Sequence, residues 1–166
     1  MIAKNNNHLC AQIGRHLVVC ELARRGIPVT EIKGSNLVCK IIADDSSEHS
    51  ITITVRTIRS GDWQFKIDHF VEVRFEGEKQ ILGTNIKPEI PHHIFILVNA
   101  GAVYGLDRFY ILEWEKLQDI IILDYSRFLA ENNGVRPSSP YSKHCIAKLK
   151  DLIKYENHWD KIIERF

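Results

Sequence analysis

The sequence predicts one domain of the α/β or α+β class, in which helices flank a central mixed β-sheet. Three observations predict this class: a helical pattern near the N-terminus, a series of strand-like segments after it, and helical patterns towards the C-terminus. The chain has 166 residues, of which 45% are hydrophobic and 26% charged, as is typical of a globular protein with one core. We therefore expect a single domain over residues 1–166, with a core at about 7–112 and a helical part at about 113–166.

The first helix is expected over residues 7–25. Apolar side chains recur there every three or four residues, as on one face of an amphipathic helix. They are Leu9, Ile13, Leu17 and Cys20. Gly26 follows directly, and glycine favours the left-handed conformation in which many helices end.

Strand-like segments rich in Ile, Val and Thr follow the helix. The clearest spans residues 50–58, and apolar and polar side chains alternate strictly within 51–57. Because successive side chains of a strand point to opposite faces, Ile53 and Val55 are expected on one face and Thr54 and Arg56 on the other. Strands at 62–67 and 70–75 are expected to continue this sheet, and the remaining expected strands are 29–33, 37–43, 94–99 and 109–112.

The polar residues 44–48 are expected to form the loop of a hairpin. Residues 113–131 predict a second long helix, which Asn133 and Gly134 end. Shorter helices are expected around 149–152 and 157–165.

Charged and apolar residues alternate over 72–81, which predicts a solvent-facing hairpin with Gly77 at its turn. A free edge on such a hairpin can pair with a second copy of the chain. A homodimer is therefore a prediction of the sequence.

Charge and hydropathy exclude several classes of protein. Lys and Arg total 22 and Asp and Glu 21, so the net charge of +1 gives no global field that attracts nucleic acid. No apolar run is long enough to span a bilayer, and Asn5–Asn7 stand where a signal peptide needs apolar residues. We expect a cytoplasmic protein that does not bind membranes.

The cysteines are expected to be reduced and to bind no zinc. Cys10, Cys20, Cys39 and Cys145 are scattered, without a C-x-x-C pair.

Several short motifs along the chain resemble those of one nuclease superfamily. Gly14, Glu21, Leu22 and Gly26 match its first helix, and residues 34–36, 39–42 and 54–57 match the strands after it. The similarity continues through 61–65, 107–110, 134–137 and 155–160. On these motifs the chain resembles the small bacterial branch of the PD-(D/E)XK, or restriction-endonuclease-like, superfamily. The resemblance implies a restriction-endonuclease-like core, with a central mixed sheet between helices.

The resemblance also implies which residues should carry catalysis. In that superfamily an Asp on the second strand and a Glu or Gln on the third hold a divalent metal ion, and a Lys two residues later acts on the water. Here the matching positions are Lys40, Thr54 and Arg56. An ammonium group repels magnesium, a threonine hydroxyl is neutral, and an arginine cannot be deprotonated to act as a base. We expect no catalytic residue and no cofactor at this vacated site.

The same replacements favour binding of DNA or RNA without cleavage. Lys40 and Arg56 would lie where the related nucleases meet a phosphate, and Lys33, Arg59 and Lys66 would extend the basic surface. Trp63 is a candidate for stacking on a base, although a tryptophan at the start of a strand also suits the core. A protein partner, such as an active nuclease subunit, is the other possibility.

Two alternatives remain open. In the first, the protein is an endonuclease that uses Mg²⁺ or Mn²⁺ held by ligands that have migrated to Glu21, Asn36 or Asp44. In the second, it is a structural or interaction subunit in which Glu21, Glu31 or Asp44 neutralises Lys40 and Arg56.

Adjacent residues His92 and His93 are expected to point in opposite directions, in a loop before the strand at 94–99. This argues against a shared metal ion.

Overall fold

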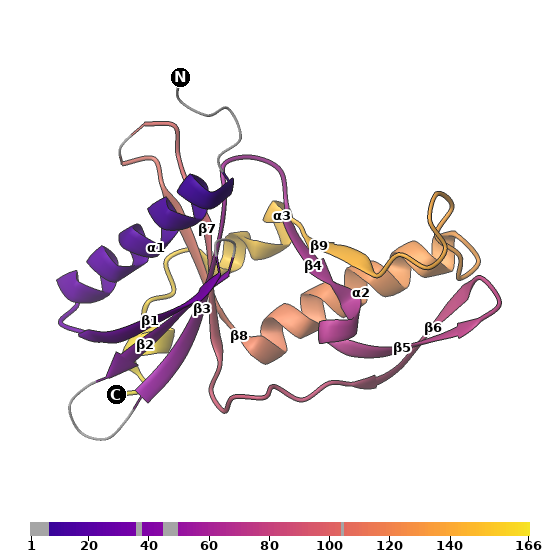
Figure 1. The fold of residues 1–166 in the computed structure, drawn as a ribbon, viewed down its shortest axis with the longest axis horizontal. Coiled ribbons are helices and arrows are strands. Elements are labelled where there is room, and N and C mark those ends of the chain that lie inside the picture. The colour runs from indigo at the N-terminus through magenta and orange to yellow at the C-terminus, as the bar shows by residue number, and fades with distance from the viewer. Residues whose placement is uncertain (1–6, 36–37, 45–49, 104) are drawn as a thin grey trace.

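A computed structural model describes residues 7–35, 38–44, 50–103 and 105–166, and for residues 30–35, 38, 39 and 44 it describes the backbone alone. The expected class is confirmed: the protein is a mixed α and β structure with a mixed central sheet and helices around it (Figure 1). The expected loop at 44–48 lies almost entirely outside the described residues.

The central sheet has five strands in the order β1-β2-β3-β7-β8. They are β1 (Val29–Ser35), β2 (Val38–Asp44), β3 (Ser50–Ile58), β7 (Ile94–Asn99) and β8 (Arg108–Glu113). Neighbouring strands are antiparallel except β3 and β7, which run parallel. Parallel neighbours require a long crossover connection, and residues 59–93 provide it.

The register of the sheet places the three expected site residues on one face. Lys40 on β2 pairs with Thr54 on β3, which pairs on its other side with Phe95 of β7. Directly opposed residues of neighbouring strands point to the same face, as do residues two apart on one strand. Lys40, Thr54 and Arg56 therefore share a face.

The opposite face of the sheet is covered by α1 (Asn7–Arg24) and α4 (Asp160–Ile163). Ile53 and Val55 are buried there against Val18 and Leu22 of α1. Gly26, with φ +76°, ends the helix, because the next residue donates its amide to the Leu22 carbonyl at 3.0 Å. The expected end of the first helix is thus confirmed.

Gly14 allows α1 to approach β3 very closely. A Cβ atom at this position would lie 1.8 Å from Oγ1 of Thr57, far inside any van der Waals contact. Only glycine fits there without a shift of the helix.

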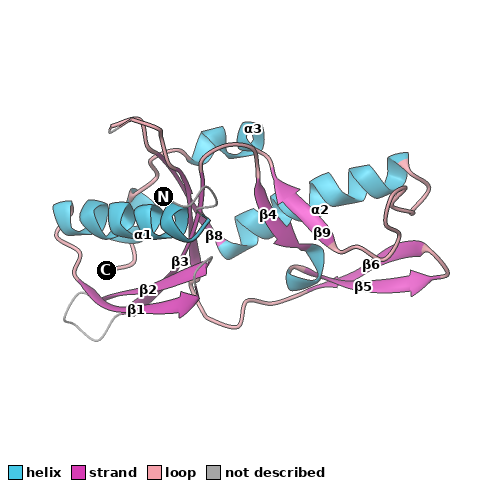
Figure 2. Ribbon diagram, turned by 45° about the horizontal axis from the view of Figure 1, so that its top comes forward, coloured by secondary structure: helices cyan, strands magenta, loops and turns pink. Residues whose placement is uncertain are grey.

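The crossover forms a second layer instead of a helix. It contains β4 (Trp63–Lys66), a 3₁₀ turn at Ile67–His69, β5 (Val71–Glu76) and β6 (Lys79–Asn85). β4 pairs with β9 (His144–Ala147), and β5 pairs with β6. These two small sheets lie with α2 (Trp114–Glu131) away from α1, as Figure 2 shows.

Two expectations need correction here. The strands expected at 62–67 and 70–75 exist but do not continue the central sheet. The part after residue 112 is not only helical, because it also provides β9. The hairpin at 72–81 is confirmed, with Gly77 at its turn, whereas the homodimer stays a prediction.

The short C-terminal helices are found as α3 (Leu149–Leu152), a 3₁₀ turn (Ile153–Tyr155) and α4. Among the described helices none is both long enough and apolar enough to cross a membrane.

Candidate functional site

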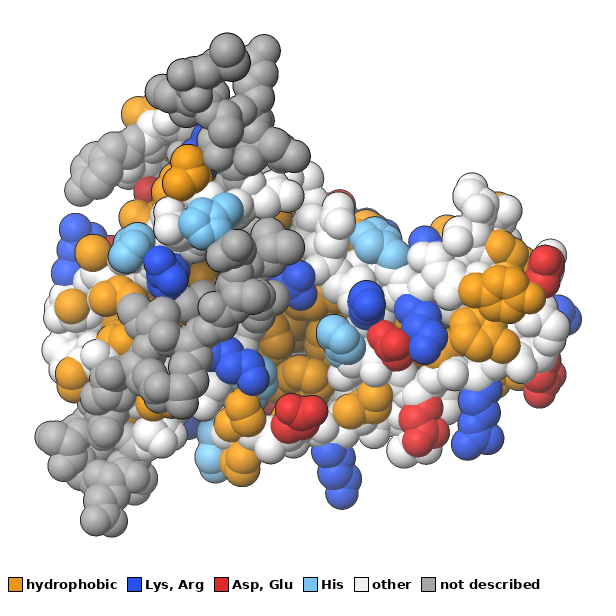
Figure 3. Space-filling view, viewed as in Figure 1, with side chains coloured by type: hydrophobic (Ala, Val, Ile, Leu, Met, Phe, Trp, Pro, Cys, Tyr) orange, Lys and Arg blue, Asp and Glu red, His pale blue; other side chains and the backbone are white. Residues whose placement is uncertain are grey.

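A pocket of about 480 Å³ opens on the face of the sheet that α1 does not cover. Lys40, Thr54 and Arg56 all line it, so the structure brings together the three residues that the sequence placed at the vacated site. The pocket is also lined by aromatic side chains and, after β6, by Ile86, Lys87, Glu89 and Ile90. In Figure 3 this region is an apolar hollow with basic, acidic and histidine side chains at its border.

Arg56 lies half-buried in this pocket. Its guanidinium carbon is 4.4 Å from the centroid of the Phe65 ring, a cation–π contact. Burial lowers the pKa of Arg56 below its usual value, yet a guanidinium remains charged at neutral pH. No carboxylate among the described side chains lies within ion-pair distance of it.

The carboxylates that were expected to neutralise this arginine lie elsewhere or outside the described side chains. Glu21 is on α1, behind the sheet, where it forms ion pairs with Arg24 and, at 2.6 Å, with Arg25. Burial alone would raise the Glu21 pKa, but the hydrogen bonds from the two arginines outweigh burial and hold the pKa below its usual value. The side chains of Glu31 and Asp44 are not among those described.

His93 is part of the site, although the sequence reasoning did not include it. Its Nε2 shares a hydrogen bond of 2.7 Å with Oγ1 of Thr54, and its ring stacks on Phe95 and Trp114 at 4.8 and 5.7 Å between centroids. Burial, helped by the charge of Lys40, lowers the pKa of His93 to about 4. The imidazole is therefore neutral at pH 7.

The place of His93 follows from the pairing of β3 with β7. Phe95 opposes Thr54 in this register, and a residue two positions earlier points to the same face. The sequence alone does not show that these two strands are neighbours. The expectation that His92 and His93 point apart is confirmed, since His92 is exposed and His93 is 8% exposed.

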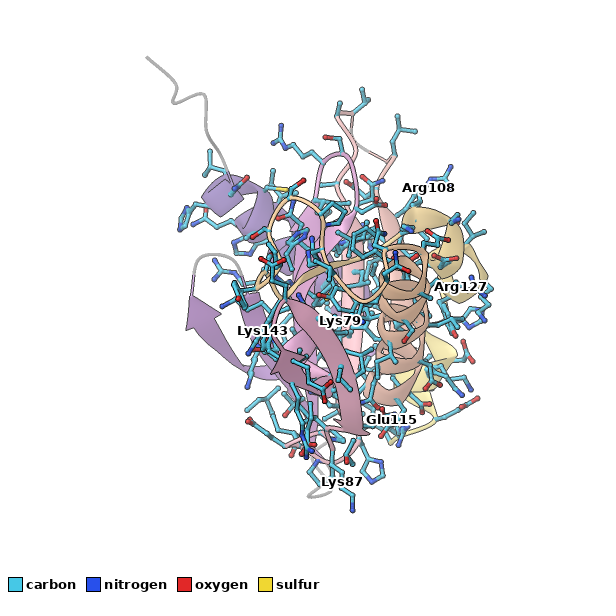
Figure 4. The ribbon with its side chains drawn as sticks, turned by 90° about the vertical axis from the view of Figure 1, so that its right-hand side faces the viewer. Lys79, Lys87, Arg108, Glu115, Arg127 and Lys143 are labelled. Carbon is cyan, nitrogen blue, oxygen red and sulfur yellow. The ribbon has the colours of Figure 1, made fainter. Side chains whose placement is uncertain are left out.

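Two acidic residues, Asp68 and Glu89, also line the pocket. Oδ2 of Asp68 forms an ion pair of 3.1 Å with Lys143, which extends from the loop before β9. Oδ1 of Asp68 is buried without a hydrogen-bond partner, as is Nε1 of Trp114 in the same pocket. Figure 4 shows Lys143 on one side of the molecule and Lys87, which also lines the pocket, at its lower end.

Of the remaining residues expected to bind nucleic acid, those with described side chains do not line the pocket. Trp63 is 1% exposed and packs edge-on against Tyr110 in the core, so it offers no ring face to a base. Arg59 and Lys66 are exposed but do not line the pocket. The side chain of Lys33 is outside the described part, although its backbone pairs with Lys40.

The residues expected to bind metal in the alternative hypothesis are not brought together in the described part of the chain. Glu21 lies behind the sheet, the Asp44 side chain is not described, and Asn36 falls outside the described residues. Within the described ranges there is no group of three or more His, Cys, Asp or Glu that could hold a metal ion.

Comparisons with family models, curated proteins and solved structures gave no match. The similarity to PD-(D/E)XK nucleases therefore rests on the sequence motifs alone.

Proposed function

We propose that the protein binds nucleic acid without cleaving it, and that Arg56 and Lys40 hold a phosphate group in the pocket. One observation carries the proposal: the Arg56 guanidinium is half-buried and has no carboxylate partner among the described side chains. Burying an unpaired charge is costly, so such a cation favours an anionic ligand. The planar guanidinium donates two parallel hydrogen bonds to phosphate oxygens.

Lys40 supplies a second positive charge to the same ligand. It opposes Thr54 across the strand pair and is therefore a diagonal neighbour of Arg56. Diagonal neighbours on one sheet face are about 7–8 Å apart, within reach of long side chains. The Lys40 side chain is exposed at the pocket rim, where a ligand can reach it.

Binding without cleavage is supported by the chemistry of the site residues. In the PD-(D/E)XK pattern, Lys40 stands in place of a metal-binding carboxylate and Arg56 in place of a lysine. The Thr54–His93 pair does not substitute for them, because a histidine with a pKa of about 4 is a weak base at pH 7. The Thr54 hydroxyl belongs to a side chain that is only 3% exposed.

The test measures binding and cleavage in one experiment. Labelled single-stranded DNA, single-stranded RNA and duplex DNA are titrated with wild type, Arg56→Gln and Arg127→Gln, with and without Mn²⁺, at low and high salt. Arg127 is an exposed arginine on α2 that does not line the pocket, and Figure 4 shows it on the side of the molecule away from Lys143. It is therefore the matched control.

We expect salt-sensitive binding that Arg56→Gln weakens about tenfold or more and Arg127→Gln leaves unchanged, since a hydrogen bond to a charged group contributes about 1.5–3 kcal/mol. Metal-dependent cutting would contradict the proposal and favour the endonuclease alternative. Equal binding by Arg56→Gln, or no binding by wild type, would also refute it.

A further inference from the structure

We infer that the pocket accepts one unpaired nucleotide with a terminal phosphate, either at the end of a single strand or as a free nucleoside monophosphate. The inference rests on the proposed function and specifies its ligand. It follows from the size of the pocket, the chemistry of its walls and the balance of charge around it.

The size of the pocket suits one small ligand. A volume of about 480 Å³ is in the usual range for small-molecule sites, about 300–1,000 Å³. Different segments of the chain enclose it: Phe65 on β4, residues 68–70, the segment 86–90, and Trp114 at the start of α2. A pocket of this volume is too small to admit an intact double helix, so a duplex would have to stay outside it.

The walls offer an apolar, aromatic surface beside the cations. Phe65, Phe95 and Trp114 line the pocket together with the neutral ring of His93. Trp114 is only half-buried, whereas Phe65 and Phe95 are each 5% exposed. Because every base has a π-face, stacking on an aromatic ring stabilises a bound nucleotide whatever its sequence. The Trp114 ring contacts Phe70, His93 and Phe95 but is the least buried of these rings, so it is the candidate for such stacking.

The charges favour a single terminal phosphate over a continuing chain of phosphates. A phosphate monoester carries a charge of about −1.5 to −2 at neutral pH, and the cations Lys40, Arg56 and Lys87 line the pocket. Asp68 and Glu89 line it as well. Because Asp68 is paired with Lys143, Glu89 is the carboxylate that would repel a further phosphate. A phosphodiester within a strand carries only one negative charge, and the phosphates on either side of it are also negatively charged. It therefore suits this pocket less well than a terminal phosphate.

The experiment is a competition assay against a fluorescent single-stranded octamer with a 5′-phosphate. The competitors are unlabelled octamers with a 5′-phosphate, a 3′-phosphate or neither, adenosine and thymidine monophosphates, inorganic phosphate, and a covalently closed duplex without ends. Wild type, Arg56→Gln, Trp114→Leu and Arg127→Gln are compared. A thermal unfolding curve for each variant verifies that it is folded.

We expect at least one end-phosphorylated octamer to compete tenfold or more better than the unphosphorylated octamer and the closed duplex, and Arg56→Gln to abolish this preference. The two end-phosphorylated octamers and the free monophosphates distinguish a strand end from a free nucleotide. Trp114→Leu is expected to weaken nucleotide binding several-fold and leave inorganic phosphate unaffected.

Tryptophan fluorescence provides an independent readout. Of the three tryptophans, Trp63 and Trp159 are 1% and 4% exposed, so a stacked base should quench Trp114 and the quenching should vanish in Trp114→Leu. If the closed duplex binds as well as the phosphorylated strand, still through Arg56, this inference fails and the proposed function stands. If inorganic phosphate competes as well as the nucleotides, the inference also fails. If wild type binds no nucleic acid and no nucleotide, both fail.

Discussion

Lowering the pH from 7 to 5 is expected to destabilise the folded protein by about 2 kcal/mol through His93 alone. The His93 pKa is about 4 in the folded protein, because the ring is buried and lies near Lys40, and 6.5 is its ordinary value. At pH values between about 4 and 6.5, His93 is protonated in the unfolded chain and neutral in the folded protein. The loss of stability therefore begins as the pH falls below 6.5 and is complete near pH 4.

Urea unfolding at pH 7 and pH 5 measures this effect. A loss of about 2 kcal/mol lowers the urea midpoint by the order of 1 M, since the denaturant slope for such a domain is about 1–3 kcal/mol/M. The matched variant is His93→Gln, whose amide does not titrate and still reaches Thr54. Every ionisable group except His93 is common to both proteins, so the difference between the two pH dependences isolates His93. An equal loss in wild type and His93→Gln would refute the reasoning, as would an NMR titration of His93 with a midpoint near 6.5.

Three further predictions concern stability, each measured by urea unfolding. Gly14→Ala should lower the free energy of unfolding by about 2 kcal/mol or more, because the new methyl group overpacks against Thr57. Adding Thr57→Ala should restore part of this loss. If the two substitutions changed the free energy of unfolding additively, the close contact between the two residues would be contradicted. Gln80→Leu should lower the free energy of unfolding by about 3 kcal/mol, and Tyr125→Phe by about 1 kcal/mol. The difference is expected because the buried Gln80 amide donates hydrogen bonds to two carbonyls and also accepts one from the Tyr125 hydroxyl. Arg56→Met should leave the free energy of unfolding unchanged or raise it, since it removes a half-buried charge that has no carboxylate partner among the described side chains. A loss above about 2 kcal/mol would instead indicate that Arg56 has a structural role.

The faces of Thr54 and Arg56 on β3 could be predicted because they depend on local pattern. Strict alternation within 51–57 assigned both side chains to one face. Lys40 was placed at the site only through the resemblance to the nuclease motifs, and the pairing of Lys40 with Thr54 agrees with that assignment. A shift of one residue would have turned these side chains to the other face, and the sequence alone did not decide between the two registers.

The rest of the pocket depends on contacts between residues far apart in the sequence. No local feature of the sequence distinguishes a short strand of the central sheet from a short strand of a second layer. The pairing of β4 outside the central sheet was therefore not predicted. Its partner β9 has four residues and lies about eighty positions away. Trp63 illustrates the consequence: β4 turns its ring into the core, next to Tyr110, and leaves Phe65 beneath Arg56.

Lys40 and His93 belong to one electrostatic arrangement, and this links the acid sensitivity of the fold to its proposed function. Without a ligand, the positive charge of Lys40 helps burial to keep His93 neutral. A phosphate held by Lys40 and Arg56 would cancel that field and raise the pKa of His93, so phosphate binding and protonation of His93 favour each other. The phosphate monoester itself also gains a proton between pH 7 and pH 5, so wild type must be compared with His93→Gln. Saturating nucleoside monophosphate should stabilise wild type more than His93→Gln at pH 5, and this difference should shrink at pH 7. If the nucleotide binds elsewhere on the surface, both proteins should gain the same stability from it at each pH.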